Sequence, residues 1–245
     1  MALSLDDKER YARDGYLLLR GAIDVRYLHN LEQKVLTLLA EWTGRRFVTV
    51  CSVEFSAFLQ ANRELERRLY NEIRKFDWLI EFSLSQNIVG PVADLIGGPV
   101  GLMKKIPFRI DLPNVTRELA VWHQDYRYVK GNTDIVTAWI PLQNTAYVQG
   151  CLMVMPGTHR LGPIDHDGHV LGKRDFPSGI FEREVRYVEM KYGDLLLFHS
   201  LLLHSSGINL SDQARLSLQS RFTRIGAETD LDMGGIVMAR EEITV

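Results

Sequence analysis

The spacing of hydrophobic and polar positions divides the chain into a first part with helical periodicity and a second part with strand periodicity. Apolar residues recur every three or four positions in residues 25–43 and 63–86, which predicts amphipathic helices. Asp24 is a suitable N-cap for the first of them and Gly44 a suitable end, because these residue types satisfy free backbone groups at helix termini. Residues 88–96 predict one more short helix. We interpret the apolar faces as packing faces.

From residue 100 onward, short apolar runs alternate with Gly, Pro, Asn and Asp. These runs predict strands at residues 102–110, 135–142, 151–155, 186–190, 194–199 and 216–223. No helix-length pattern separates them, so a barrel or sandwich is favoured over a parallel β-α-β sheet. We therefore expect a mainly β protein with a helical layer, forming a single domain over 1–245. Residues 1–99 would be the mostly helical support layer and 100–245 the barrel.

Composition narrows the classes of function. The 245 residues include 29 Lys+Arg and 31 Asp+Glu, a formal charge of −2 that argues against a strongly basic nucleic-acid-binding surface. Cys51 and Cys151 lie in apolar contexts, so we interpret them as reduced buried thiols. No signal-peptide pattern opens the chain, and no apolar run approaches the roughly 20 residues of a membrane span. We expect a cytoplasmic monomer or homodimer without nucleic-acid or membrane partners.

Candidate metal chemistry begins at Trp122-His-Gln-Asp125. Residues two apart in a strand share a face, so His123 and Asp125 can both reach one ion. Such a pair is common by chance, but His204 follows a long apolar run and precedes a Ser-Ser-Gly turn, which places a second imidazole on another strand. Two imidazoles and one carboxylate leave three positions of an octahedral ion open. This arrangement suits Fe(II) that binds a co-substrate and O₂ together.

Arg215 is a candidate for binding the co-substrate, because it lies eleven residues after His204. After the intervening turn the chain should run back antiparallel, which would bring Arg215 to the same mouth of the barrel. Its planar guanidinium can hold a carboxylate through two parallel hydrogen bonds, and Ser217, two residues on, points the same way. Without the spacing to His204, a solvated surface arginine would be the simpler interpretation.

Two rivals to this site are present in the sequence. His199 also ends an apolar strand, but only His204 has both the following Ser-x-Gly turn and the eleven-residue spacing to an arginine. The cluster at residues 165–169 could bind a metal through His166 and His169. Its polar loop context favours a solvated lid segment instead.

Several motifs together resemble the phytanoyl-CoA dioxygenase family of Fe(II)/2-oxoglutarate oxygenases. The similar stretches are Trp122-His-Gln-Asp125, Ala138-Trp-Ile-Pro-Leu142, Gly150-Cys-Leu-Met-Val-Met-Pro-Gly-Thr-His159, Gly193-Asp-Leu-Leu-Leu-Phe-His199, and His204-Ser-Ser-Gly-Ile-Asn209 leading to Arg215-Leu-Ser217. They follow the order of the family over residues 122–222. The resemblance implies a double-stranded β-helix, or jelly-roll, with iron at one mouth.

The resemblance also implies roles for individual residues. It makes His123, Asp125 and His204 the iron ligands, and it makes Arg215 the partner of the distal carboxylate of 2-oxoglutarate. Related halogenases replace the carboxylate ligand with a small residue so that chloride can coordinate. Because Asp125 is present here, we do not expect halogenation.

Trp139 and Ser206 align with positions that line the co-substrate pocket in this family, and Ser217 is a further candidate. For each of these a structural role stays open, since Trp139 could be plain core and Ser206 could serve only the turn. The lysine that the family carries before the His-x-Asp motif is not clearly reproduced. Three cations occupy the equivalent region, and the sequence does not decide which faces the site: Lys104, Lys105 and Arg109.

The expected function is an Fe(II)- and 2-oxoglutarate-dependent dioxygenase that uses O₂ to hydroxylate a small-molecule metabolite and releases succinate and CO₂. One alternative is a cupin-like hydrolase or isomerase that uses the same site with Zn or Mn, which would leave Arg215 unexplained. The other is a non-catalytic metabolite-binding module with a vestigial site. Residues 104–117, 126–130 and 159–181 mix aromatic and cationic side chains, which fits an anionic or polyhydroxylated metabolite as well as a solvated rim.

Overall fold

The computed structural model describes residues 2–115, 121–129, 132–164, 176, 178–225 and 236–238, the last three by their backbone alone. Its α-helices are α1 (Leu5–Asp14), α2 (Val25–Thr43), α3 (Val53–Ala61), α4 (Arg63–Ile73), α5 (Asp77–Ser83) and α6 (Gln86–Ile96). Its strands are β1 (Tyr16–Leu19), β2 (Val100–Met103), β3 (Phe108–Asp111), β4 (Val136–Pro141), β5 (Leu152–Val154), β6 (Arg186–Val188), β7 (Leu195–His199), β8 (His204–Ser206), β9 (Arg215–Arg224) and β10 (Ile236–Met238). Short 3-10 helices lie at Asp125–Tyr128, Tyr147–Gln149, Thr158–Leu161 and Ile180–Glu182.

Local sequence signals account for the ends of α2. The side chain of Asp24 accepts a hydrogen bond from the backbone N–H of Arg26, which caps the first turn. Gly44 adopts the left-handed conformation with φ 70° and ends the helix, as predicted.

The helix predicted over residues 63–86 is wrong in its extent, because the chain there forms α4, α5 and the start of α6. Phe76 has an extended backbone, with φ −74° and ψ 116°, so α4 ends before it and α5 begins after it. The break allows Leu79 and Phe82 of α5 to be buried in the core as well as Leu69 of α4. Helix α3 has no counterpart in the sequence prediction.

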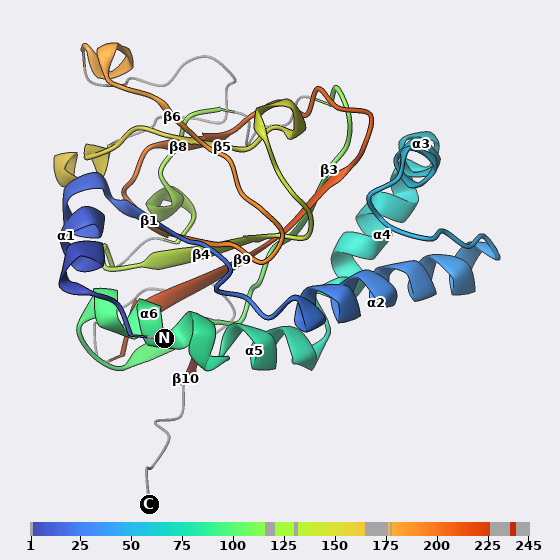
Figure 1. The fold of residues 1–245 in the computed structure, drawn as a ribbon, viewed down its shortest axis with the longest axis horizontal. Coiled ribbons are helices and arrows are strands. Elements are labelled where there is room, and N and C mark those ends of the chain that lie inside the picture. Colours follow the sequence, from blue (N-terminus) through green and yellow to red (C-terminus); the bar gives the residue numbers. More distant parts are fainter. Residues whose placement is uncertain are drawn as a thin grey trace, which may run out of the picture.

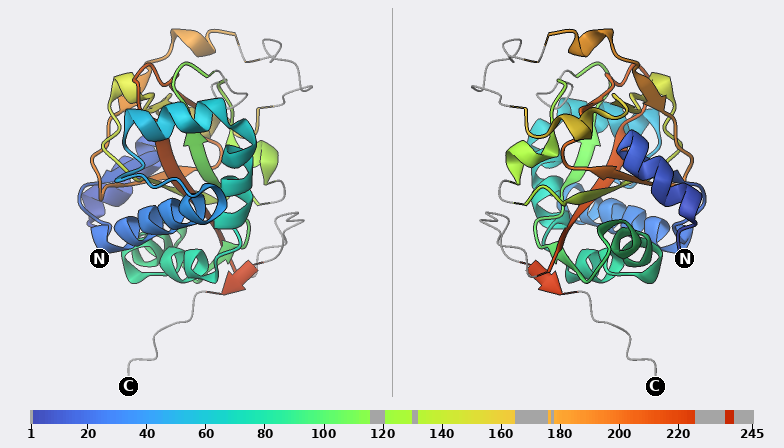
Figure 2. Two further views of the ribbon diagram at one scale, coloured as in Figure 1. Left: turned by 90° about the vertical axis from the view of Figure 1, so that its right-hand side faces the viewer. Right: turned by 90° about the vertical axis from the view of Figure 1, so that its left-hand side faces the viewer.

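Two antiparallel sheets form the β part of the molecule (Figure 1). The major sheet has the order β1-β7-β4-β9-β2-β10, with β3 also paired to β9, and the minor sheet has the order β6-β5-β8. Helices α2, α5 and α6 lie on the side of the major sheet opposite to the minor sheet, and Figure 2 shows these layers from two further directions. The predicted mainly β fold with a helical layer and a jelly-roll core is confirmed.

Several strands differ from the sequence prediction, and β10 has no counterpart in it. The run predicted over 102–110 is divided into β2 and β3, which pair with successive parts of β9. Pro107 lies in the break between them, where it has no backbone N–H to donate to a neighbouring strand. Residues 16–19 form β1, an edge strand of the major sheet within the mostly helical first part. The assignment of 1–99 and 100–245 to one domain stays a prediction.

Alternation along β9 separates a core face from a polar interior face. Leu216, Leu218 and Phe222 belong to the large hydrophobic cluster that joins the major sheet to the helices. The intervening residues face the space between the two sheets, because successive side chains of a strand point to opposite faces. This interior face carries Arg215, Ser217, Gln219 and Arg221. Within the described residues, no helix is both long and apolar enough to cross a bilayer.

Candidate metal centre

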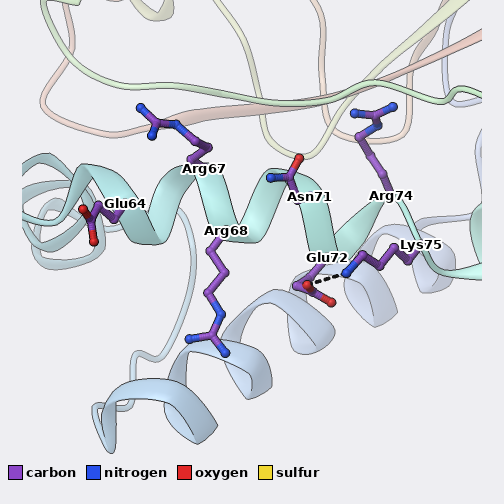
Figure 3. A pocket seen from close by; sticks show the side chains of 7 residues that line it. All are labelled: Glu64, Arg67, Arg68, Asn71, Glu72, Arg74 and Lys75. Atoms are coloured by element: carbon purple, nitrogen blue, oxygen red, sulfur yellow. Dashed lines mark hydrogen bonds and ion pairs between the residues drawn. The ribbon is translucent and has the colours of Figure 1, made fainter.

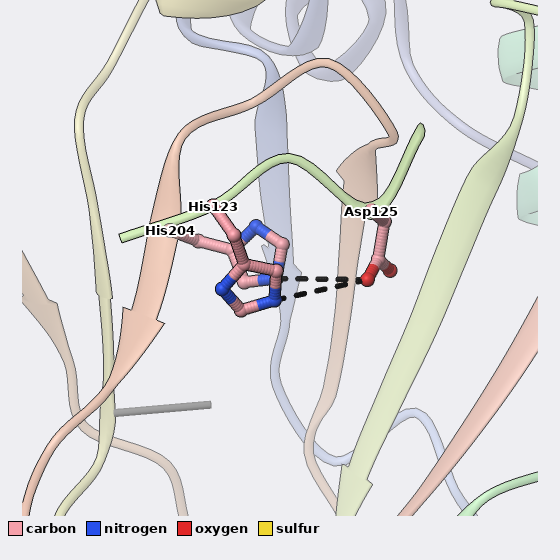
Figure 4. A group of neighbouring side chains, drawn as sticks. All are labelled: His123, Asp125 and His204. Carbon is pink, nitrogen blue, oxygen red and sulfur yellow. Dashed lines mark ion pairs between the residues drawn. The ribbon is translucent and has the colours of Figure 1, made fainter. Parts of the chain in front are cut away.

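His123, Asp125 and His204 converge between the two sheets (Figure 4). Their candidate ligand atoms all lie within 4.8 Å of one another. Asp125 Oδ1 is 4.0 Å from His123 Nε2 and 3.9 Å from His204 Nε2. These separations are shorter than twice a metal–ligand bond of about 2.1 Å, so one ion can contact all three atoms. All three residues are buried.

The strand conformation assumed for His123 and Asp125 is wrong, although the two side chains do meet. His123 forms only an isolated bridge with His204, in which each backbone N–H donates to the carbonyl oxygen of the other, at 2.9 and 3.0 Å. Asp125 then begins the 3-10 helix Asp125–Tyr128. Gln124 fixes this turn, since its side-chain amide donates to the carbonyl oxygens of Gly162 and Leu201. A turn that Gln124 anchors to distant segments of the chain, and not strand alternation, places Asp125 opposite the two histidines.

Each histidine is held in one tautomer by its own backbone. His123 Nδ1 lies 2.8 Å from the carbonyl oxygen of Val121, and His204 Nδ1 lies 2.9 Å from that of Leu202. A carbonyl oxygen only accepts hydrogen bonds, so Nδ1 carries the proton in both rings. Nε2 therefore presents its lone pair on the side of Asp125. Burial lowers the pKa of His204, which keeps this imidazole in the neutral, metal-binding form.

Asp125 is held by Arg221 and Thr137. Arg221 Nε donates to Oδ2 at 3.0 Å and Nη2 to Oδ1 at 2.9 Å, and the Thr137 hydroxyl donates to Oδ2 at 2.7 Å. Burial alone would raise the pKa of Asp125, but the charge of Arg221 and the hydrogen bonds that it donates outweigh this effect and hold the pKa well below its ordinary value. Two imidazoles and an ionised carboxylate are the donor set that fits Fe(II).

Arg221 was not among the residues predicted from the sequence. The signal that could have found it is the same alternation that links Arg215 to Ser217, continued for four more residues along β9.

A cavity of about 370 Å³ opens onto the three donor side chains. This volume lies within the range of small-molecule sites. The remaining lining residues are Tyr70, Lys105, Pro107, Arg109, Tyr128, Trp139, Leu152, Phe198, Ser206, Gln219 and Arg221.

Arg215 lies deep beside this cavity, with 1% of its surface exposed. Its Nη2 donates to Asp111 Oδ2 at 2.7 Å and to the Ser206 hydroxyl at 3.4 Å, and its Nη1 donates to the carbonyl oxygen of Gly150. Asp111, on β3 opposite Arg215, was not predicted from the sequence. Burial would raise the pKa of Asp111, but the charges of Arg215 and Arg109 outweigh this and lower it to about 2.

Three buried polar atoms in this region have no hydrogen-bond partner among the described residues: Trp139 Nε1, Arg215 Nε and Ser217 Oγ. The guanidinium carbon of Arg215 lies 5.8 Å from the centre of the Trp139 ring. Buried donors without acceptors are costly and rare in folded proteins. Their concentration at one place fits an anionic ligand that would accept from them. All three residues are among the four that the sequence associates with 2-oxoglutarate, and the fourth, Ser206, accepts a hydrogen bond from Arg215.

The other candidates lie elsewhere or only partly at the site. The ring of His199 packs near those of Tyr11 and His159, with centroids 6.5 and 5.3 Å away, and it does not join the donor group. Residues 165–169 lie outside the described part of the chain. Of the three cations left open by the sequence, Lys105 and Arg109 line the cavity, whereas Lys104 does not.

A jelly-roll fold with a buried two-histidine, one-carboxylate site defines a class of enzyme, the Fe(II)- and 2-oxoglutarate-dependent oxygenases. The family model described as phytanoyl-CoA dioxygenase (PhyH) matches residues 11–217 of this chain. The chain therefore belongs to the phytanoyl-CoA dioxygenase family, and its cofactors are Fe(II), 2-oxoglutarate as co-substrate, and O₂.

Similar proteins and structures agree with this membership. A probable phytanoyl-CoA dioxygenase from Caenorhabditis elegans is 26% identical over 239 residues, which cover 90% of this chain and 75% of that protein. The 1-deoxypentalenic acid 11-beta-hydroxylase of Streptomyces exfoliatus is 28% identical over 241 residues, covering 90% and 82%. The epimerase SnoN, solved with Fe3+, alpha ketoglutarate and nogalamycin RO, shares the fold with a TM-score of 0.61 at 23% identity, covering 89% of this chain and 82% of SnoN.

Proposed function

We propose that this oxygenase hydroxylates a small-molecule metabolite at a metal centre held by His123, Asp125 and His204. The observation that supports it best is the burial of two imidazoles and one carboxylate in the wall of a 370 Å³ cavity. In the overall reaction, substrate, 2-oxoglutarate and O₂ give the hydroxylated substrate, succinate and CO₂, which balances both oxygen atoms of O₂.

The chemistry that iron supplies when bound is the activation of O₂, coupled to the oxidation of 2-oxoglutarate. The contribution of this chain is to hold the donor atoms in place before the ion arrives. The carbonyl oxygens of Val121 and Leu202 orient the two rings, and Arg221 keeps the carboxylate of Asp125 ionised and fixed. Such outer hydrogen bonds set ligand orientation and basicity.

The same proposal assigns the distal carboxylate of 2-oxoglutarate to Arg215, with Ser217, Ser206 and Trp139 around it. Arg215 offers a charged Nε, Ser217 a hydroxyl and Trp139 an indole N–H, and all three are buried without acceptors in the described residues. A carboxylate placed among them would satisfy these donors with charge-assisted hydrogen bonds.

Apolar side chains complete the wall next to the metal centre. Leu152 and Phe198 line the cavity, and the Phe198 ring lies 4.6 Å from that of His204. Their packing excludes water from one side of the donor group, which favours oxidation of a bound substrate over side reactions with solvent.

The proposal is tested by anaerobic addition of Fe(II) and 2-oxoglutarate to the metal-free protein. We expect a weak visible charge-transfer band, absent in Asp125→Ala and present in the control His199→Ala, whose ring lies outside the donor group. With O₂ and a metabolite library, succinate should rise only when a substrate is present. Near-normal hydroxylation by Asp125→Ala, or turnover with Zn or Mn that consumes no O₂, would contradict it and favour the hydrolase or isomerase.

The proposal extends to a monomer or homodimer that acts in the cytoplasm without nucleic acid. The net charge of −2 supports the absence of a nucleic-acid partner. The two free cysteines support a reducing compartment. Burial raises the pKa of both thiols to about 11, which makes them poor nucleophiles. Light scattering after size-exclusion chromatography tests the oligomeric state, and a larger assembly would contradict it.

A further inference from the structure

Two cations line the cavity on its β2–β3 side. Lys105 lies between the two strands, and Arg109 lies on β3 opposite Ser217 of β9. Arg109 is 9% exposed, so its guanidinium is largely enclosed by protein. Lysine and arginine are almost never buried without a partner that offsets their charge. This rule applies to Arg109, whereas Lys105 is an exposed residue that also lines the cavity.

Asp111 pairs with Arg109, but its single negative charge does not balance the positive charges of Arg109 and Arg215 together. Arg109 Nη2 donates to Asp111 Oδ1 at 2.8 Å and Nε to Oδ2 at 3.4 Å, while Oδ2 also accepts from Arg215 Nη2. One carboxylate is thus shared by two guanidinium groups. Arg109 Nη1 and Lys105 Nζ form no hydrogen bond with any residue that the structure describes.

Positive charge exceeds negative charge around the cavity. Among the described residues that line it or pair directly with its wall, four are cationic and two are carboxylates: Lys105, Arg109, Arg215 and Arg221 against Asp111 and Asp125. A divalent iron and the dianion of 2-oxoglutarate cancel each other, so two positive charges remain. One of these two charges belongs to the exposed Lys105, and the other remains from three buried arginines against two carboxylates. Because uncompensated buried charge is unfavourable, a further ligand that is negatively charged is favoured.

Arg74, the residue that follows α4, places a positive charge behind the same wall. Tyr70 of α4 lines the cavity, and the guanidinium of Arg74 lies 4.8 Å from the centre of its ring. Figure 3 shows Arg67 and Arg74 projecting from α4 on the side away from α2, whereas Arg68 points toward α2. Cations grouped on one side of a cleft raise the local concentration of anionic ligands.

We propose that the primary substrate carries an oxyanion, a carboxylate or a phosphate, and that Arg109 and Lys105 bind it. This inference rests on the proposed function, because it assigns the substrate of that same site. The anion would occupy the β2–β3 wall, separate from the donors assigned to 2-oxoglutarate. The β2–β3 wall and the metal centre border the same cavity, so the rest of the substrate would lie between them.

The test uses the whole protein with Zn(II) in place of iron and saturating 2-oxoglutarate, so that binding is measured without turnover. Calorimetric titration compares four probes with one carbon skeleton: octanoate, octyl phosphate, octanamide and octylamine. We expect at least one anion to bind about tenfold or more tightly than the amide and the amine, as charge-assisted hydrogen bonds predict. The tighter of the two anions identifies the oxyanion. Equal affinity for octanamide would overturn the proposal.

Matched variants locate the anion site. Arg109→Gln should weaken binding of the tighter anion about tenfold, Arg109→Lys should retain part of it, and Lys105→Gln, at an exposed position, should weaken it about threefold. The control Lys104→Gln, which removes an adjacent charge outside the cavity, should change nothing. If Arg109→Gln does not fold, the comparison of anion affinity between Lys105→Gln and Lys104→Gln tests the proposed site by itself. An equal effect of the two lysine variants would overturn the inference.

Measuring 2-oxoglutarate binding distinguishes failure of the substrate assignment from failure of the proposed oxygenase function. Unchanged affinity for 2-oxoglutarate in Arg109→Gln supports a substrate role, whereas a loss confined to 2-oxoglutarate would assign Arg109 to the co-substrate and overturn the inference. If neither Zn(II) nor 2-oxoglutarate binds the unmodified protein, the proposed function itself fails. Normal binding of both, with no preference for anions, contradicts only the substrate assignment.

Discussion

Arg221 binds Asp125 through both carboxylate oxygens, at 3.0 and 2.9 Å, from a position 96 residues further along the chain. The pair joins the middle of β9 to the turn that follows His123. Under the proposed assignment of Asp125 to the metal, Arg221 would be a positioning residue that fixes the direction and the ionisation of a ligand.

Replacement of Arg221 by glutamine should lower metal affinity about 10–100-fold, the range found when an outer hydrogen-bond partner of a ligand is removed. Thr137→Val removes a single hydrogen bond to the same carboxylate and should have a smaller effect. Competition against a chelator measures both, and circular dichroism checks that the variants fold. Unchanged metal affinity in Arg221→Gln would show that Asp125 does not depend on this pair.

Arg215→Ala should raise the KM for 2-oxoglutarate about 10–100-fold, because a buried charge-assisted contact is lost. Metal affinity measured without 2-oxoglutarate should change little, since Arg215 does not touch the donor group. Ser217→Ala should give a smaller increase. Arg215→Lys should not restore the affinity, because an ammonium group cannot form two parallel hydrogen bonds. Equal KM values in Arg215→Ala and the unmodified protein would contradict the assignment.

Asp111 should make the stability of the protein depend on acid pH. Its pKa is lowered from 3.8 to about 2 in the folded state, so the unfolded chain binds the proton more readily. The stabilisation is fully present above pH 4 and is lost as the pH falls toward 2, by about 2 kcal/mol.

The contribution of Asp111 is measured by comparing the unmodified protein with Asp111→Asn. The other carboxylates are the same in both proteins, so the pH dependence of the difference in stability reports on Asp111. Denaturant unfolding at pH 6 should show the variant destabilised, since it leaves Arg109 and Arg215 without their shared carboxylate. The difference between the two proteins should narrow between pH 4 and pH 2.5. A difference independent of pH would refute the lowered pKa of Asp111.

Gly150→Ala should destabilise the fold and weaken 2-oxoglutarate binding together. Gly150 has φ +73°, and a Cβ atom there would lie 2.5 Å from the carbonyl oxygen of Gly207. Its own carbonyl accepts from Arg215, so the displacement needed to relieve this contact would move the arginine. We expect a loss of about 2–4 kcal/mol, which exceeds the cost of the left-handed backbone alone.

Gly44→Ala is the matched control for this substitution. Gly44 has a similar φ of +70°, but no atom of the described residues lies within 4 Å of the place that an alanine Cβ would occupy. The variant should lose only about 1–2 kcal/mol in urea unfolding and keep its affinity for 2-oxoglutarate. Equal losses in the two variants would show that the contact between Gly150 and Gly207 is unimportant.

Local signals in the sequence determined much of this protein. The caps of α2, the strand character of β4, β7 and β9, and the short motifs around His123 and His204 all depend on neighbouring residues, which the sequence displays directly. The eleven-residue spacing to Arg215 could likewise be measured along the chain. These features were sufficient for the family, the fold class and the expected cofactors.

Only the tertiary structure decided which side chains support the site. Asp111 meets Arg215, and Arg221 meets Asp125, because of strand register and a turn anchored by Gln124. Register depends on packing of both sheets and on hydrogen bonds between distant segments, which no local pattern encodes. Packing also decides that Lys105 and Arg109 line the cavity and that Lys104 does not. The sequence determined the residue types available for catalysis, and packing determined which of them share one enclosed space.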